Sequence, residues 1–314
     1  MVDDKIIIIS GPTATGKSRL AIELALWLRE QGYPAEIISA DSAQVYRYMD
    51  IGTDKLPSEE RKGIPHHLID VVEPDHPFDA MKFRTLALKE IERIGKEGGI
   101  PIIVGGTGFW IRVLIYGLFT GPGRSPEIRA ELKKLAEERG RWYLHQLLEK
   151  IDPASAKKIH PNDIQRLIRA LEVYQLTGKP LSEHFGERAS SGLNVLHFAL
   201  NFERNLLYQR INQRVDEMME RGFLEEVKRL REMGYGPELE SQKIIGYRQL
   251  HSYLDGRLNL EKAVHEIKKQ TRHYARRQLV WLRGEKDLVW LDPLKEKDKV
   301  FEKSQQFIGE EENE

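Results

Sequence analysis

Residues 11–18 read Gly11-Pro12-Thr13-Ala14-Thr15-Gly16-Lys17-Ser18 and stand between an apolar run, Ile6–Ile9, and a long amphipathic segment, Arg19–Gln31. The run predicts a buried strand and the segment predicts a helix. A glycine-rich turn at the start of a helix leaves backbone N–H groups unpaired, and the helix dipole there favours an anion. Lys17 adds positive charge for an outer phosphate, and the Ser18 hydroxyl can bind Mg²⁺ held by the same phosphates. The stretch predicts a phosphate-binding loop; an ordinary strand-to-helix turn is the alternative.

The composition limits the kinds of protein to consider. A length of 314 residues suggests about two domains or one domain with a large insertion. The absence of cysteine excludes disulfides, thiolate zinc sites and cysteine nucleophiles. The start, Met1–Lys5, has no basic leader and no apolar run reaches the length of a membrane span, so we expect a cytoplasmic protein without membrane contact. The net charge is zero, so a polyanionic partner must meet a local basic patch.

Apolar strands alternate with helical patterns in the first part of the chain. Strand patterns occur at Lys5–Ser10, Glu36–Ala40 and Ile100–Gly105, with a helical pattern such as Met81–Gly95 between them. This alternation predicts an α/β fold, a P-loop-containing parallel sheet flanked by helices. The charged stretch Ser125–Thr177 has helical periodicity and no convincing strand. It predicts an all-helical insertion domain.

The second half of the chain completes the predicted core. Leu193–Phe202 resembles a further strand, Leu206–Arg283 is helical in pattern, Asp287–Leu291 suggests a last strand, and 295–314 suggests a charged helix or tail. The predicted organisation is a first part of the P-loop core at 1–120, a helical insertion domain at 121–190, and a core completion with a helical C-terminal region at 191–314.

Two more strand ends carry residues that suit a site. Asp41 follows the second predicted strand, and Gly105–Trp110 forms a glycine-rich turn after the third. Ligands of open parallel sheets bind beyond the carboxyl ends of the strands, so both stretches should lie in the crevice of the phosphate-binding loop. Asp41 is a candidate base, although an aspartate at such a position can equally cap a helix. A sterically required tight turn is the alternative for Gly105–Trp110.

Seven motifs make a family resemblance specific. The chain is similar to bacterial tRNA dimethylallyltransferases, also called tRNA isopentenyltransferases, over nearly its whole length. The motifs, in chain order, are GPTATGKS, DSAQVYRYMDIGTDK, PHHLID, VGGTGFW, NDIQRLIRALE, KIIGYRQ and RRQLVWLRG.

The resemblance implies transfer of a dimethylallyl group from dimethylallyl diphosphate to N6 of adenosine 37, 3′ of the anticodon of tRNA, with release of diphosphate. It implies that residues 11–18 hold the diphosphate, that Thr13 and Lys17 contact it, that Ser18 binds Mg²⁺, and that Arg214 reaches it from the far side. Asp41 would accept a proton or hydrogen bond from N6. Without the resemblance, Arg214 is one charge on a solvated helix face.

A basic stretch near the C-terminus suits RNA. Lys268–Arg283 contains six basic residues and no acidic one, interleaved with aromatic side chains. A solvated basic helix is the alternative, and Leu279, Trp281 and Leu282 are expected in the core. With the resemblance, we predict contacts with the anticodon stem-loop and a flipped target base. The predicted tRNA-contacting residues are Asp41, Ser42, Ala43, Gln44, Thr107, Arg129, Gln165, Arg166, Leu167, Ile168, Arg169, Lys243, Gly246, Tyr247, Arg248, Arg272, Arg276, Arg277 and Arg283.

Other interpretations predict different chemistry. A P-loop small-molecule kinase would transfer phosphate, and a non-enzymatic RNA-binding nucleotide switch would couple hydrolysis to RNA affinity, whereas the transferase consumes no ATP or GTP. His66–His67 suggests a metal, but no third ligand stands at zinc-like spacing, so a structural role is expected. We expect the protein to act as a monomer.

Overall fold

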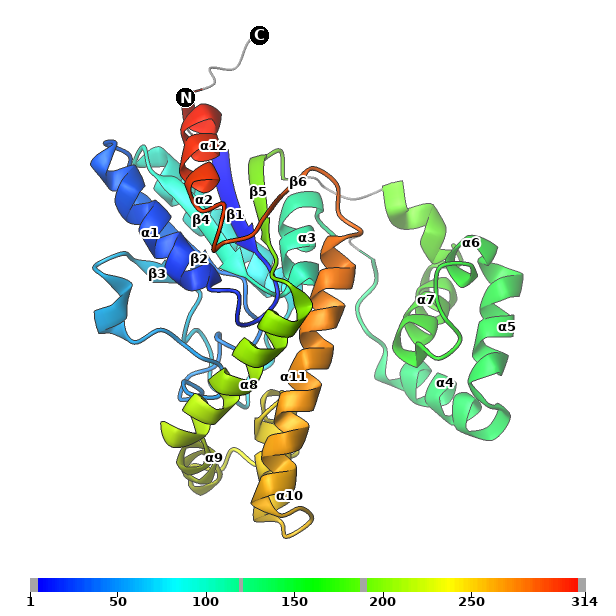
Figure 1. Ribbon diagram of the computed structural model, residues 1–314. Helices are drawn as coiled ribbons and strands as arrows, with labels where there is room; N and C mark the ends of the chain where they lie inside the picture. The colour runs from blue at the N-terminus through cyan, green and yellow to red at the C-terminus, as the bar shows by residue number, and fades with distance from the viewer. Residues whose placement is uncertain (1–4, 119–120, 187–190, 310–314) are drawn as a thin grey trace. The chain divides into compact units, whose positions relative to one another are not determined.

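The structure is a computed structural model that describes residues 5–118, 121–186 and 191–309 (Figure 1). The chain forms two compact units: unit 1 comprises Met1–Ile115 and Gly192–Glu314, and unit 2 comprises Tyr116–Ser191. The first four residues, at which we expected no leader, and the last five residues of the expected tail lie outside the described residues.

A parallel sheet forms the centre of unit 1. Its spatial order is β3-β2-β4-β1-β5-β6, and all neighbouring strands are parallel. In the middle of the sheet, Ile7 lies opposite both Ile102 and Leu196. The central strands are isoleucine-rich because both faces of the sheet are covered. The predicted α/β fold class is confirmed, and the strands are β1 (Lys5–Ser10), β2 (Ala35–Ser39), β3 (His66–His67), β4 (Ile100–Gly105), β5 (Asn194–Leu200) and β6 (Leu288–Leu291).

Helices cover the sheet because their apolar residues recur on one side. In α1, Leu20, Leu24 and Leu28 are buried against the sheet, at the spacing of one helical face. The helices of unit 1 are α1 (Lys17–Glu30), α2 (Ala80–Lys96), α3 (Gly108–Tyr116, whose last residue belongs to unit 2), α8 (Arg204–Glu220), α9 (Phe223–Glu232), α10 (Tyr247–Leu254), α11 (Leu260–Leu282) and α12 (Asp298–Gly309), with short 3-10 helices η1 (Ser58–Arg61) and η3 (Glu240–Lys243).

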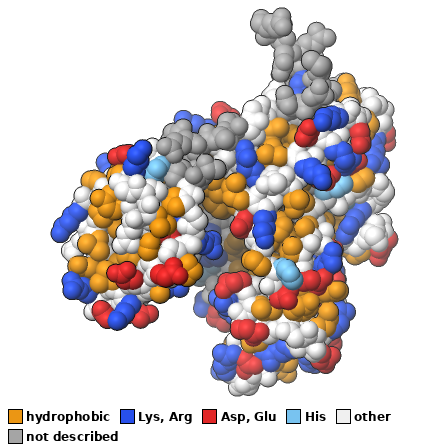
Figure 2. Space-filling model, turned by 180° about the vertical axis from the view of Figure 1, so that it is seen from behind, with side chains coloured by type: hydrophobic (Ala, Val, Ile, Leu, Met, Phe, Trp, Pro, Cys, Tyr) orange, Lys and Arg blue, Asp and Glu red, His pale blue; other side chains and the backbone are white. Residues whose placement is uncertain are grey.

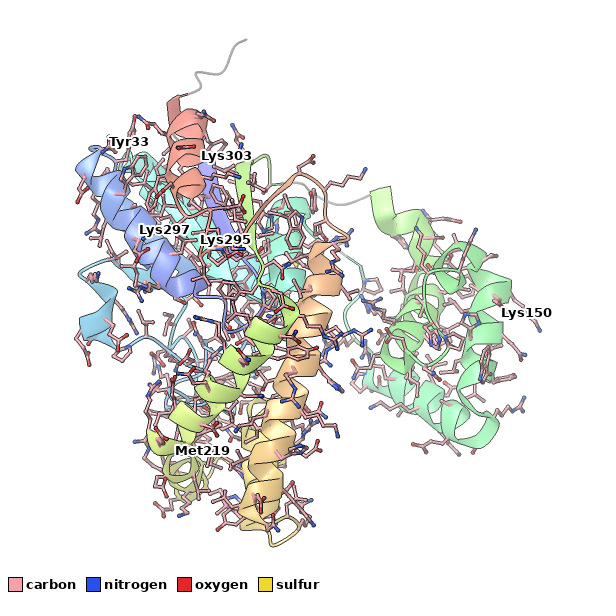
Figure 3. All side chains as sticks on the ribbon, in the orientation of Figure 1. Tyr33, Lys150, Met219, Lys295, Lys297 and Lys303 are labelled. Carbon is pink, nitrogen blue, oxygen red and sulfur yellow. The ribbon has the colours of Figure 1, made fainter. Side chains whose placement is uncertain are left out.

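The C-terminal helix α12 packs beside α1. The rings of Trp27 and Phe301 meet edge to face, with 5.6 Å between centroids. Lys297, labelled in Figure 3, forms an ion pair with Glu23 of α1 at 2.6 Å. On the face that Figure 2 shows, charged side chains of both signs are interspersed, in accord with the zero net charge. Within the described ranges, no helix has the length and apolarity that crossing a membrane requires.

Unit 2 has a hydrophobic core of its own. Leu132, Leu144, Leu148 and Leu171 are buried in it. The part of unit 2 that the structure describes contains helices and no strand, which agrees with the all-helical pattern of the sequence. Side-chain caps fix where three of its helices begin; one is Ser125, whose hydroxyl accepts from the N–H of Ile128. The helices are α4 (Pro126–Arg139), α5 (Arg141–Ile151), α6 (Pro153–Ala156), α7 (Ile164–Thr177) and the 3-10 helix η2 (Leu181–Gly186).

Candidate active site

The glycine-rich loop between β1 and α1 has the geometry of an anion cradle. Gly16 adopts a left-handed conformation with φ 81°, and no side chain caps the first turn of α1. The Thr15 hydroxyl donates to the Pro12 carbonyl at 2.8 Å and closes the loop internally. The N–H groups at the start of α1 are thereby left for an external anion.

Two cations stand at this loop. The Lys17 ammonium donates to the Pro12 carbonyl at 2.7 Å. Arg214, from α8, donates to the Thr13 hydroxyl. Desolvation, and then the charge of Arg214, lower the pKa of Lys17 to about 8, while Asp41 and Asp54 oppose the shift. Concentrated positive charge of this kind would be relieved by a ligand that carries several negative charges.

Helix α8 contacts the phosphate loop through two arginines. The Arg214 guanidinium, which donates to Thr13, also forms an ion pair with Asp54 at 3.0 Å. One helical turn earlier, Arg210 donates to the Ala14 carbonyl at 3.0 Å. The sequence did not predict a role for Asp54, although this residue lies in the second motif. Its partner, Arg214, is 160 positions further along the chain (214 − 54).

Asp41 lies at the end of β2, where its neighbours form turns. One oxygen of its carboxylate accepts from the N–H of Ala43 at 2.9 Å. The Thr107 hydroxyl, from the turn after β4, accepts from the N–H of Ser42 at 3.0 Å and so ties the two strand ends together. No helix begins at Asp41, so the helix-cap alternative is wrong. Burial lowers the pKa of Lys17 and the charge of Asp41 opposes that shift, which is consistent with a position of the carboxylate near the phosphate loop.

Glu226 of α9 holds the loop that carries Asp54. Its buried carboxylate accepts from the backbone N–H groups of Asp50, Ile51 and Gly52 at 2.9, 2.7 and 3.1 Å. It also accepts from the Tyr247 hydroxyl at 2.6 Å. This support was missed from the sequence, because an acidic residue on an amphipathic helix gives no sign of a buried partner 174 to 176 positions away.

The predicted RNA-contacting residues of unit 1 differ in their access to solvent. Arg276, Arg277 and Arg283 are exposed on or just after α11, whereas Arg272 is partly buried and donates to Asn212 at 2.6 Å. Lys243 and Arg248 are exposed; Ser42, Ala43, Gln44 and Thr107 are half-buried.

Two predicted RNA contacts of unit 1 need correction. The side chain of Tyr247 is fully buried against Glu226, and the backbone of Gly246 is buried as well, so neither residue is exposed for contact with RNA. The amide of Gln44 is engaged internally, with Ser39 at 3.1 Å and the Thr53 carbonyl at 3.3 Å.

In unit 2, the predicted contacts gather around a buried carboxylate. Glu172 is fully buried and accepts from Arg129 at 2.7 and 2.9 Å and from Arg169 at 2.9 Å. Burial raises the pKa of Glu172, but the hydrogen bonds from both arginines outweigh it and hold the pKa at about 2. Gln165 and Arg166 are exposed on α7, whereas Leu167 and Ile168 are buried in the unit's core, which corrects their assignment as RNA contacts.

The histidine pair does not form a metal site. His67 bonds to Glu36 at 2.7 Å, and His66 to the Ile64 carbonyl at 2.8 Å. Throughout the described ranges, no cluster of three or more histidine, aspartate or glutamate side chains could hold a metal ion. A metal at the phosphate loop would therefore depend on Ser18 and on the ligand itself.

Comparison with known proteins agrees with the seven motifs. The sequence model of the IPP transferase family matches residues 44–285. A tRNA dimethylallyltransferase of Carboxydothermus hydrogenoformans is 47% identical over 306 residues, with 96% of each chain covered. One of Thermotoga petrophila is 46% identical over 307 residues, with 98% of each covered.

Solved structures give the same result. The tRNA isopentenylpyrophosphate transferase of Bacillus halodurans matches with a TM-score of 0.73 at 38% identity, over 97% of both chains. A eukaryotic dimethylallyltransferase acting on tRNA matches with a TM-score of 0.78 at 33% identity, over 97% of this chain and 79% of the other. The predicted resemblance is confirmed: the chain belongs to the IPP transferase family.

Proposed function

We propose that this chain is a tRNA dimethylallyltransferase. It transfers the dimethylallyl group of dimethylallyl diphosphate to N6 of adenosine 37 in the anticodon stem-loop of tRNA and releases diphosphate. The observation that carries the proposal is the meeting of the phosphate loop, two cations and Asp41 in one site. One chain supplies all of these groups, and we propose that it acts as a monomer.

The phosphate loop is suited to a diphosphate leaving group. When the bond between C1 of the dimethylallyl group and the diphosphate oxygen breaks, negative charge grows on that oxygen. Lys17 and Arg214, which both contact the phosphate loop, and the N–H groups at the start of α1 would stabilise this charge when the diphosphate is bound. Thr13, which accepts from Arg214, lies beside the same phosphates and orients that guanidinium.

The residues present fit a magnesium ion. Mg²⁺ binds through one or two protein groups together with substrate phosphates and retains several waters. The half-buried Ser18 hydroxyl at the start of α1 is such a group. Bound there with the diphosphate, Mg²⁺ would supply further stabilisation of the leaving group's charge.

In the proposed reaction, Asp41 acts on the nucleophile. The lone pair of an adenine amino group is delocalised into the ring, so it attacks poorly unless a base draws on its proton. One Asp41 oxygen is fixed by the Ala43 N–H, which leaves the other for N6. As the N6–C1 bond forms, the departing N6 proton passes to this carboxylate. The target base must leave its stack to reach the strand ends, as in other enzymes that modify a base.

Surfaces on both units supply candidate tRNA contacts. In unit 1, Arg276, Arg277 and Arg283 are exposed, and among the described residues none of the three has an acidic partner within 4.0 Å. In unit 2, Gln165 and Arg166 are exposed on α7, whereas Arg129 and Arg169 are half-buried and held by Glu172. Exposed arginines suit phosphate contacts along an RNA backbone.

The decisive experiment follows label into RNA. The protein is incubated with labelled dimethylallyl diphosphate, Mg²⁺ and unmodified tRNA, with ATP in a parallel tube. The proposal predicts labelled RNA without ATP. ATP turnover without labelled RNA would mean that the loop binds a nucleotide, as a kinase or a switch would, and would overturn the proposal.

A further inference from the structure

The inner side of α11 reaches the loops of the proposed active site. Gln278 is buried, and the oxygen of its amide accepts from the N–H of Thr13, in the phosphate loop, at 3.0 Å. The nitrogen of the same amide donates to the Gly106 carbonyl, in the turn after β4, at 2.9 Å. One side chain thus joins two loops of the site through backbone atoms on both.

Glycines in the turn after β4 allow this close approach. A Cβ atom on Gly106 would lie 2.2 Å from the Gln278 amide nitrogen, and one on Gly108 would lie 2.2 Å from the Trp281 ring. The backbone can therefore meet α11 only where side chains are absent. A small cavity between the phosphate loop and α11 is lined by Gly11 together with Gln278 and Trp281.

Thr107, which follows Gly106 in the turn after β4, continues the link toward Asp41. Its hydroxyl accepts from the N–H of Ser42, next to Asp41, at 3.0 Å. A chain of contacts therefore runs from the phosphate loop through Gln278 to Gly106, and from Thr107 to the strand end that carries Asp41. Tyr274, one helical turn before Gln278 on α11, lies near Thr107, Gln278 and Asp41.

We propose that Gln278 is a positioning residue for the transfer reaction: it sets the position of the phosphate loop relative to Asp41. The inference rests on the proposed function, in which Thr13 borders the leaving group and Asp41 the nucleophile. Because a transfer step depends on the distance between the two, loosening this link lowers turnover more than it lowers binding. The helix that carries the exposed arginines also carries this link, so tRNA docking and active-site geometry share one element.

A variant at Gln278 tests the link. Gln278→Met keeps the length and bulk but removes both hydrogen bonds, and we expect kcat to fall about tenfold or more, the effect of about 1.4 kcal/mol or more in the barrier. KM for tRNA stays within about twofold of wild type, because the exposed arginines are unchanged.

The pH dependence of kcat in Gln278→Glu distinguishes a positioning role from a purely structural one. An ionised glutamate accepts from the Thr13 N–H but cannot donate to the Gly106 carbonyl, whereas a protonated glutamate does both, as the amide does. We expect the ratio of variant to wild-type kcat to rise as pH falls from about 8 to about 5.5. Tyr274, the titratable neighbour of Gln278, stays protonated in this range, because burial and then Asp41 raise its pKa to about 12.

Matched controls lie outside the site. Gln306→Met and Gln306→Glu, exposed on α12, make the same chemical changes and should leave kcat unchanged. Unchanged kcat in Gln278→Met and a flat pH ratio in Gln278→Glu would overturn the inference, provided that the wild-type protein labels tRNA. A wild-type protein that labels no tRNA would instead overturn the proposed function. Gln278→Glu, which keeps one of the two hydrogen bonds, keeps the test valid if Gln278→Met does not fold.

Discussion

Replacing Glu226 by alanine tests how the loop bearing Asp54 is held. The side chain is 4% exposed, and its carboxylate receives three backbone N–H groups and the Tyr247 hydroxyl. Hydrogen bonds to a charged group contribute about 1.5–3 kcal/mol each, so the four together contribute at least about 6 kcal/mol. Water entering the vacated space re-forms some of them, and we expect a net loss of about 4 kcal/mol in the free energy of unfolding of unit 1.

The neighbouring Glu225 supplies the control. It lies on the same helix but is exposed, and its one ion pair, with Lys228 at 3.4 Å, is exposed too. Glu225→Ala should therefore cost less than about 0.5 kcal/mol. Glu226→Gln is an intermediate case. The amide oxygen still accepts, but the NH₂ group is a donor and faces at least one backbone N–H that also donates. We therefore expect a loss of about 2 kcal/mol in the free energy of unfolding.

Urea denaturation gives the stability difference, and hydrogen exchange of residues 50–52 locates it. In Glu226→Ala these amides should exchange faster before the rest of unit 1 does, because they have lost their acceptor. Turnover should fall as well, since Asp54 orients Arg214. If Glu226→Ala and Glu225→Ala are equally stable within about 0.5 kcal/mol and residues 50–52 stay protected, the carboxylate does not hold this loop.

Four further predictions address the chemistry and the RNA surface. Asp41→Ala should lower single-turnover transfer at least about a hundredfold while tRNA binding survives; unchanged transfer removes Asp41 from the mechanism. Replacing Arg276 and Arg277 by alanine should weaken tRNA binding and reduce the salt slope by up to about two counterions, and an unaltered slope places the RNA elsewhere. Because the pKa of Lys17 is lowered to about 8, calorimetric affinity for inorganic diphosphate should decline as pH rises through 8, and a level profile contradicts a role for its charge. Because the pKa of Glu172 is lowered to about 2, its stabilising contribution is complete above about pH 4.5 and is lost as pH falls toward 2. Glu172→Gln should therefore lower the thermal unfolding midpoint at neutral pH, and the difference from wild type should shrink on acidification. A difference that is constant with pH would refute the ion-pair account.

The sheet could be predicted where the residues of a strand alone show that it is a buried strand. β1 and β4 begin and end where the sequence predicts, because strands buried on both faces read as continuous apolar runs. β3 was missed because it comprises only His66 and His67, half-buried polar residues whose strand geometry comes from pairing with β2. Short edge strands of this kind have no periodicity to recognise.

The residues of the site also fall into two groups, those that the local sequence identifies and those that it does not. The phosphate loop and Asp41 lie within local motifs, so residue type and spacing identify them. Arg214 was predicted only through the family resemblance, and Asp54 and Glu226 were not predicted. All three act through partners 160 to 201 positions away, and their surroundings in sequence are those of ordinary amphipathic helices and loops. Tertiary contacts at such separations follow from the fold and not from the local pattern.

For Gln278, the sequence does contain a feature from which its contact with the loops could be predicted. It lies among Leu279, Trp281 and Leu282, on the side of α11 that the sequence assigned to the core, and it is the polar residue in that group. A buried amide destabilises a protein unless both its donor and its acceptor are satisfied, and a helix interior leaves no free backbone groups to do so. Its partners must therefore come from non-helical backbone, and in this fold the non-helical backbone beside α11 is that of the loops at the strand ends. A glutamine in an apolar helical face thus predicts contact with the loops that bind the ligand, which is the contact on which the coupling of α11 to catalysis depends.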